Sequence, residues 1–335
     1  MVFKSSFIKK KLLFFGTVFC FIFTLLTVGI IYDINRSFRH PYYNSKTVVL
    51  IEKGASLSQI TSRLVEDGVL GFPLLFKAYL LCTGEWRELK AGEYLIPPEV
   101  TPAQLIEILK SGDVILHPVT LIEGETSHHL TQKLLNNPRF QGICTVPSEG
   151  SLLPETYHFP RGTERQVIIK RMQKAMKSAI MKLWNGRPKD CVLQTPEELV
   201  ILASIVEKET SLPHERPVVA AVFLNRIKAN MLLQADPTVL YALGKGMEVK
   251  TRELSLEDLK VESPYNTYLY AGLPPTPITN PGILSLKAVM YPREVPYLYF
   301  VANGARGHVF AITLEEHQRN HEEWRRIRAE KQMGE

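Results

Sequence analysis

Two glutamates near the end of one predicted helix are the residues of this 335-residue chain that bear most directly on chemistry. Thr195 can cap that helix and Pro196 suits its first position, so the helix runs towards Glu207 and Glu209. Its apolar positions repeat at helical spacing and comprise Leu199, Leu202, Ala203, Val206 and Thr210. Glu209 continues this spacing, so we expect its side chain to project from the apolar face.

The expected position of Glu209 would raise the pKa of its carboxyl, because burial and the negative end of the helix dipole both penalise the charged form. A carboxyl that stays protonated near neutral pH can act as a general acid at a glycosidic oxygen. Glu207 lies about 200° away around the helix axis, so the two carboxyls cannot face one site. We interpret Glu209 as the chemical group and Glu207 as a structural or electrostatic support. The alternative is that both are solvated charges.

The elements that must position Glu209 lie in a predicted unit over residues 116–330. We expect a strand from residue 116, helices at 127–135 and 162–184, and a helix that starts near Pro217. Residues 247–296 are rich in Pro, Gly, Asn and Tyr and are typical of long ordered loops. Strands at 297–301 and 308–312 form a predicted hairpin, and Thr313 can cap a last helix that ends near Arg328.

A smaller unit is predicted over residues 46–115. Its expected elements, in order, are a strand at 46–51, a helix capped by Ser56, a helix at 74–81, a strand at 92–96, and a helix that starts at Pro102 and ends before Gly112. The two units together predict an α+β fold.

The N-terminal region predicts a membrane anchor. Residues 12–32 contain no charged side chain and are long enough to span a hydrocarbon core of about 30 Å. Only basic charges precede this run, at Lys4, Lys9, Lys10 and Lys11. The positive-inside rule therefore predicts a cytoplasmic tail at 1–11, a transmembrane helix at 12–32 and a linker at 33–45 outside the membrane. A cleaved signal peptide is the alternative, but the run is longer than a usual signal core.

Several functional classes find no support in the residue pattern. Cys82, Cys144 and Cys191 have no spacing typical of a metal site, and sequence cannot choose a disulfide pair among them. His317 and His321 lie four residues apart without an HExxH arrangement, so we expect them on a charged outer face. No phosphate loop or nucleic-acid motif is present, and the formal charge of +6 is weak evidence for an anionic partner. We predict no metal and no cofactor.

Several long segments, in the same order, resemble the endolytic murein transglycosylases, the YceG-like family. They are GSLLPETYHFPRGT (150–163), TPEELVILASIVEKETSLP (195–213), ERPVVAAVFLNRIKANMLLQADPTVLYALG (215–244), SPYNTYLYAGLPPTPITNPG (263–282), PYLYFVANGARGHVF (296–310) and EEH (315–317). Thr276 departs from the family pattern, in which many members have Gly, and affects only the local loop. The resemblance implies a LysM-like domain at 46–115 and a lytic transglycosylase domain at 116–330.

The resemblance also implies a reaction. A lytic transglycosylase cuts the β-1,4 bond between N-acetylmuramic acid (MurNAc) and N-acetylglucosamine (GlcNAc) without adding water. Glu209 would protonate the leaving oxygen and then accept the proton of the C6 hydroxyl, which closes a 1,6-anhydro ring. One carboxyl can serve both steps, whereas a hydrolase normally uses two. The implied partners are peptidoglycan strands, the membrane and cell-wall synthases, with no nucleic acid.

Polar and aromatic residues of the matched segments are the candidates for substrate binding: Asn225, Gln234, Asp236, Thr238, Asn266, His308, Tyr157, Tyr265 and Tyr268. Each also has a structural interpretation, since Asp236 can start a turn, the tyrosines can anchor loops and Asn225 can brace its helix. One other function stays open, that of a membrane-anchored scaffold that binds glycan without cutting it. We discount a pyridoxal-phosphate lyase, because it would need a phosphate cradle that the sequence lacks.

Overall fold

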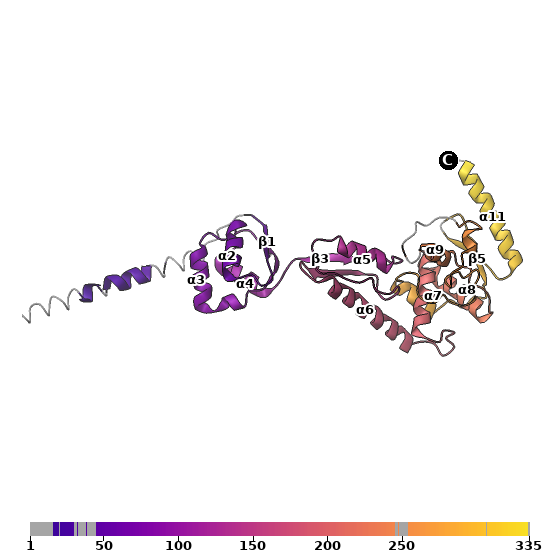
Figure 1. Cartoon of the computed structure of the whole chain (residues 1–335), viewed down its shortest axis with the longest axis horizontal. Helices are drawn as coiled ribbons and strands as arrows, with labels where there is room; N and C mark the ends of the chain where they lie inside the picture. Colours follow the sequence, from indigo (N-terminus) through magenta and orange to yellow (C-terminus); the bar gives the residue numbers. More distant parts are fainter. Residues whose placement is uncertain are drawn as a thin grey trace, which may run out of the picture. The chain divides into compact units, whose positions relative to one another are not determined.

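The computed structural model describes residues 16–19, 21–29, 32, 38, 45–244, 247, 254–305 and 307–333. The chain divides into two compact units, Met1–His117 and Pro118–Glu335, which are described separately (Figure 1). No helix among the described residues is long and apolar enough to cross a membrane. The predicted span at 12–32 falls partly outside them, at 12–15, 20, 30 and 31.

The first unit is a two-stranded antiparallel sheet packed with helices. Its elements are β1 (Thr47–Ile51), α2 (Leu57–Glu66), α3 (Pro73–Thr83), the 3-10 helix η1 (Glu85–Arg87), β2 (Gly92–Ile96) and α4 (Pro102–Ser111). Val49 of β1 pairs with Tyr94 of β2, and both are fully buried. Capping boxes at Ser56 and Thr101 start α2 and α4, because each hydroxyl satisfies a free amide of the first turn.

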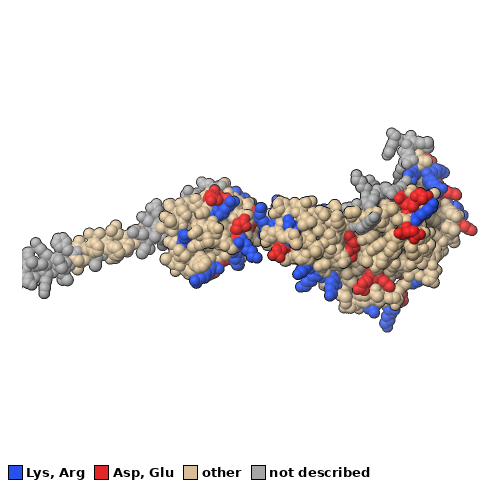
Figure 2. Space-filling view, viewed as in Figure 1, with Lys and Arg blue, Asp and Glu red and all other residues tan. Residues whose placement is uncertain are grey.

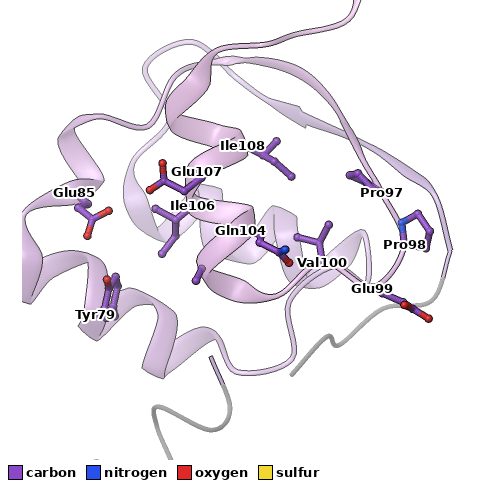
Figure 3. A pocket seen from close by; sticks show the side chains of 11 residues that line it. Tyr79, Glu85, Pro97, Pro98, Glu99, Val100, Gln104, Ile106, Glu107 and Ile108 are labelled. Carbon is purple, nitrogen blue, oxygen red and sulfur yellow. The ribbon is translucent and has the colours of Figure 1, made fainter. Parts of the chain in front are cut away.

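A cavity of about 610 Å³ opens on this unit beside α4 (Figure 3). It is lined by Tyr79 of α3, by Glu85 of η1, and by Pro97, Pro98 and the residues that lead into α4. Glu99 lies at its edge with a φ of 61°, a left-handed conformation that is uncommon for a residue other than glycine. The cavity thus collects side chains from three separate elements.

The second unit is mainly helical and carries two further two-stranded sheets. In order its elements are β3 (Leu116–Thr120), α5 (Ser127–Leu135), β4 (Thr156–Pro160), α6 (Arg165–Asn185), α7 (Pro196–Glu209), α8 (Arg216–Lys228), α9 (Asp236–Gly244), η2 (Asp258–Lys260), α10 (Ile283–Met290), β5 (Tyr299–Ala302), β6 (His308–Ala311) and α11 (Leu314–Met333). β3 pairs with β4, and β5 pairs antiparallel with β6.

Helix α7 lies at the centre of this unit and contacts α6, α8, α9 and α10. Every residue from Leu199 to Val206 is buried, so the helix has no solvent-facing side along these turns. A helix that is apolar all round requires cover on all sides. The predicted apolar face was therefore too narrow, because it omitted Val200, Ile201 and Ile205, which are buried as well.

Two helices of this unit differ from the sequence-based expectation. The segment 247–296, predicted as loops, contains α10, whose residues Leu286, Val289 and Met290 pack into the core. Asp236 begins α9 and does not make a simple turn. On the face drawn in Figure 2, basic side chains lie along the outer edge of α6. The exposed lysines of that helix are Lys170, Lys174, Lys177 and Lys182.

Candidate active site

Glu209 is the last residue of α7, and the chain leaves the helix directly after it through the extended residue Thr210. Burial, the largest effect, and the nearby charge of Asp236 together raise the pKa of the Glu209 carboxyl to about 8, against the opposing charge of Arg226. No described residue donates a hydrogen bond to this carboxyl. Glu209 is therefore protonated at neutral pH and able to give a proton away.

Glu207 has the opposite environment, although it lies only two residues earlier. One oxygen accepts a hydrogen bond from the Arg216 guanidinium at 2.8 Å, and the other accepts one from the backbone N–H of Gly282 at 2.8 Å. The Glu207 side chain is only 3% exposed. Both oxygens are thus engaged at the starts of α8 and α10, which makes Glu207 a support that joins three helices at the end of α7.

Asp236 and Tyr268 form a second polar group near Glu209. The Tyr268 hydroxyl donates to Asp236 Oδ1 at 2.6 Å. Burial raises the pKa of Tyr268, and the charges of Asp236 and Glu209 add to this rise, so the phenol stays protonated. The structure thus brings together three of the residues singled out from sequence, Glu209, Asp236 and Tyr268, from α7, the start of α9 and the loop after η2.

Arg226 completes this group and was not among the residues predicted for the site. Its Nε donates to the Leu298 carbonyl at 2.6 Å, its Nη1 donates to the Leu233 carbonyl at 2.8 Å, and its guanidinium lies 5.2 Å from the Tyr299 ring centre. These contacts hold a buried cation whose charge acts on Glu209. A weak sequence signal did exist, since Arg226 lies two residues after the apolar run from Val218 to Leu224 in α8.

Other predicted binding residues use their polar groups within the protein. The fully buried Asn266 donates to the carbonyls of Leu259 and Val261 at 2.9 Å each. Asn225 donates to the carbonyls of Val295 and Tyr297 at 2.9 Å and 3.0 Å. The buried Tyr157 donates to the Leu153 carbonyl in a separate core cluster, and the buried Thr238 hydroxyl bonds within the core to Ala235 and Thr267. The hydrogen bonds of these four side chains therefore brace the surrounding loops and core.

The remaining predicted residues lie at the edges of this region. Gln234 is exposed in a left-handed conformation, with a φ of 51°. The hydroxyl of half-buried Tyr265 is 2.6 Å from that of Thr276, the residue that departs from the family pattern. His308 is paired through Nδ1 with Glu215 at 2.7 Å. Of these residues, Gln234 has the most exposed side chain.

No group of three or more potential metal ligands is found among the described residues. His317 faces inward, which corrects the expected outer face, because its ring stacks on Tyr299 with centroids 5.2 Å apart. Burial lowers the pKa of His317. Cys82, Cys144 and Cys191 are free thiols.

An α+β scaffold that holds a protonated carboxyl at the end of a buried helix defines a candidate acid–base catalyst. The chain belongs to the YceG-like family, whose model matches residues 49–323, and this confirms the resemblance seen in the motifs. It is 33% identical over 316 residues to the endolytic murein transglycosylase of Bacillus subtilis (strain 168), across 84% of this chain and 86% of that protein. It is 28% identical over 324 residues to the endolytic murein transglycosylase of Streptococcus pneumoniae (strain ATCC BAA-255 / R6), across 83% of this chain and 58% of that protein.

The fold is also similar to a solved structure. The crystal structure of a YceG-like protein from Listeria monocytogenes aligns with a TM-score of 0.53 and 32% sequence identity. The alignment covers 82% of this chain and 98% of that chain. The mixed α+β architecture is therefore that of a YceG-like fold.

Proposed function

We propose that the protein is a lytic transglycosylase that cuts within peptidoglycan strands at the β-1,4 bond between MurNAc and GlcNAc and leaves 1,6-anhydroMurNAc ends. The relatives named above support the enzyme class. The observation that carries the mechanism is the single carboxyl of Glu209, whose pKa is raised to about 8. A group that is protonated at neutral pH is suited to the first step of such a reaction.

In this mechanism Glu209 protonates the leaving glycosidic oxygen, and the resulting carboxylate accepts the proton of the C6 hydroxyl as that oxygen attacks C1. The buried cation of Arg226 favours the carboxylate form between these two steps. The negative charge of Asp236, fixed by the Tyr268 hydroxyl, favours the positive charge that develops on the sugar ring. A second catalytic carboxyl is not required.

The location and the accessory unit belong to the same proposal. We infer that residues 12–32 anchor the chain in the cytoplasmic membrane, so that the larger unit acts on the outer side, where peptidoglycan strands and their synthases are found. The LysM-like assignment of residues 46–115 stays a prediction. The cavity beside α4 is the place at which glycan binding to that unit should be tested.

The decisive experiment digests isolated glycan strands with the purified full chain in detergent and identifies fragment ends by mass spectrometry. We expect 1,6-anhydroMurNAc ends, and none with Glu209→Gln. Reducing ends would indicate a hydrolase and overturn the mechanism. Strand binding without any fragments, unchanged by Glu209→Gln, would indicate a scaffold.

A further inference from the structure

Glu215 is a second buried carboxylate close to the end of α7, and the mechanism above does not use it. It is 7% exposed and stands at the start of α8. Its Oε2 accepts a hydrogen bond from the Thr210 hydroxyl at 3.1 Å and lies 2.7 Å from His308 Nδ1. Its Oε1 accepts one from the His308 backbone N–H at 2.9 Å. Burial alone would raise the pKa of Glu215, but the hydrogen bonds from His308 outweigh it and lower the pKa.

The surroundings of this carboxylate leave it little freedom. A Cβ added to Gly307 would come within 2.7 Å of Glu215 Oε1, so a side chain at position 307 would push the carboxylate out of its present place. The Thr210 hydroxyl also accepts a hydrogen bond from the Leu212 backbone N–H at 3.1 Å. Glu215 therefore ties together the exit from α7, the start of α8 and the β5–β6 hairpin.

Thr210, whose hydroxyl is bound by Glu215, directly follows Glu209 in the chain. Because no described residue hydrogen-bonds to the Glu209 carboxyl, its direction depends on the backbone of the last helical turn, which tends to fray in an unsupported helix. Glu207 fixes that turn two residues before Glu209. We propose that Glu215 is a positioning residue, which fixes the turn from the other side through Thr210 and so aims the Glu209 carboxyl at the glycosidic oxygen.

This inference rests on the proposed function and assigns His308 to the support of Glu215. It predicts that loss of the Thr210–Glu215 contact slows the chemical step while substrate binding is retained. Glu215→Gln should lower kcat about 10- to 100-fold with little change in KM, since small misplacements of a catalytic group have effects of this size. It should also move the alkaline limb of the pH–rate profile, because the surroundings of Glu209 change.

The experiment uses the full chain in detergent and compares Glu215→Gln with Glu93→Gln, which removes a partly buried carboxylate that also pairs with a histidine, His117, in the first unit and does not line the cavity beside α4. Since Glu215→Gln can impair folding, a gentler pair is measured in parallel. Thr210→Val deletes only the hydroxyl and should lower kcat, whereas Thr210→Ser retains it and should restore activity. Backbone amide hydrogen exchange at the end of α7 should be faster in Glu215→Gln and in Thr210→Val, and unchanged in Thr210→Ser and in the control variant.

The proposal is overturned if Thr210→Val matches the unaltered chain in kcat, in its pH profile and in exchange at the end of α7. Failure of the proposed function looks different. In that case the unaltered chain yields no 1,6-anhydroMurNAc ends, while the exchange measurement still reports whether Glu215 holds this turn.

Discussion

Two glutamates separated by one lysine have unlike chemistry because their partners differ. Glu207 gives both oxygens to hydrogen bonds from Arg216 and Gly282, whereas the Glu209 carboxyl receives none from the described residues. A carboxyl in the second situation holds its proton to a higher pH. The division of roles therefore follows from the helix ends that surround each side chain.

The raised pKa of Glu209 has a consequence for stability that can be measured. Between the ordinary pKa of 4.5 and the folded-state pKa of about 8, the unfolded chain carries the charge and the folded chain does not. Glu209 therefore costs increasing stability as pH rises through this range. We expect Glu209→Gln to abolish activity yet to melt at a higher temperature than the unaltered chain at pH 8. The melting temperature should rise by about 2–4 °C for each kcal/mol gained in the free energy of unfolding. If the difference in melting temperature between the variant and the unaltered chain is the same at pH 5 as at pH 8, the assigned pKa is contradicted.

The charge of Asp236 gives a prediction for the pH dependence of activity. The rate should fall as pH rises through about 8, because the general acid loses its proton. Since Asp236 raises the pKa of Glu209, Asp236→Asn should move this alkaline limb to lower pH. Tyr268→Phe removes a hydroxyl but no charge and should leave the limb closer to its original position. A limb that does not move in Asp236→Asn would show that the two carboxyls do not interact.

At this scale, helical spacing was enough to single out Glu209 but could not supply its neighbours. Arg226 and Glu215 act through contacts with Leu298 and His308, which lie more than seventy residues away along the chain, and no local pattern reports such pairings. The same limit explains why Asn266 and Asn225 were predicted to bind substrate although their amides donate to backbone carbonyls. The sequence around a polar residue is the same whether its amide faces a ligand or a buried carbonyl.

Among the elements, α7 depends on its attachment to α8 and α10 through a buried ion pair. The Arg216 and Glu207 side chains are 6% and 3% exposed, so removal of one charge leaves the other buried without its partner. We expect Arg216→Met to lower the free energy of unfolding by about 3 to 5 kcal/mol. Arg326→Met, which breaks the exposed pair with Glu323, should have almost no effect. Chemical denaturation of the full chain measures both, and equal values would contradict the role assigned to Glu207.

Element prediction succeeded where caps and periodicity were strong and failed where they were weak. Thr195, Ser56, Thr101 and Thr313 each mark the start of a helix and accept the expected backbone hydrogen bond. Helix α10 has only eight residues, starts after Pro281–Gly282 and has no side-chain cap, so its sequence resembles a loop. Its helical form depends on packing against α7 and α8, which local sequence does not report.

At the scale of the whole molecule, Phe38 packs into the core of the first unit. Its ring is 8% exposed and lies 4.8 Å from the Tyr79 ring and 6.5 Å from the Phe76 ring. We expect Phe38→Ala to destabilise this unit by about 3 kcal/mol, the usual cost of removing a buried aromatic ring. Leu74→Ala, at an 82% exposed position, serves as the control. Limited proteolysis of the full chain should detect the difference, and equal resistance would mean that Phe38 is not part of the core.

The proposed anchor gives a second prediction at this scale. Deletion of residues 1–36 removes the apolar run but retains Phe38, so the first unit should stay folded. We expect the shortened chain to move from the membrane fraction to the soluble fraction and to keep its activity on isolated strands. Retention in the membrane fraction would assign membrane binding to another part of the protein.

The burial of α7 from Leu199 to Val206 has a consequence for anyone who wishes to alter what the protein cuts. All eight of these positions are buried, so substitutions there are expected to destabilise the fold before they change the reaction. Laboratory selection for new cleavage preferences should therefore leave these positions unchanged and randomise exposed residues near Arg226, beginning with Gln234, whose Oε1 lies 3.5 Å from Arg226 Nη1.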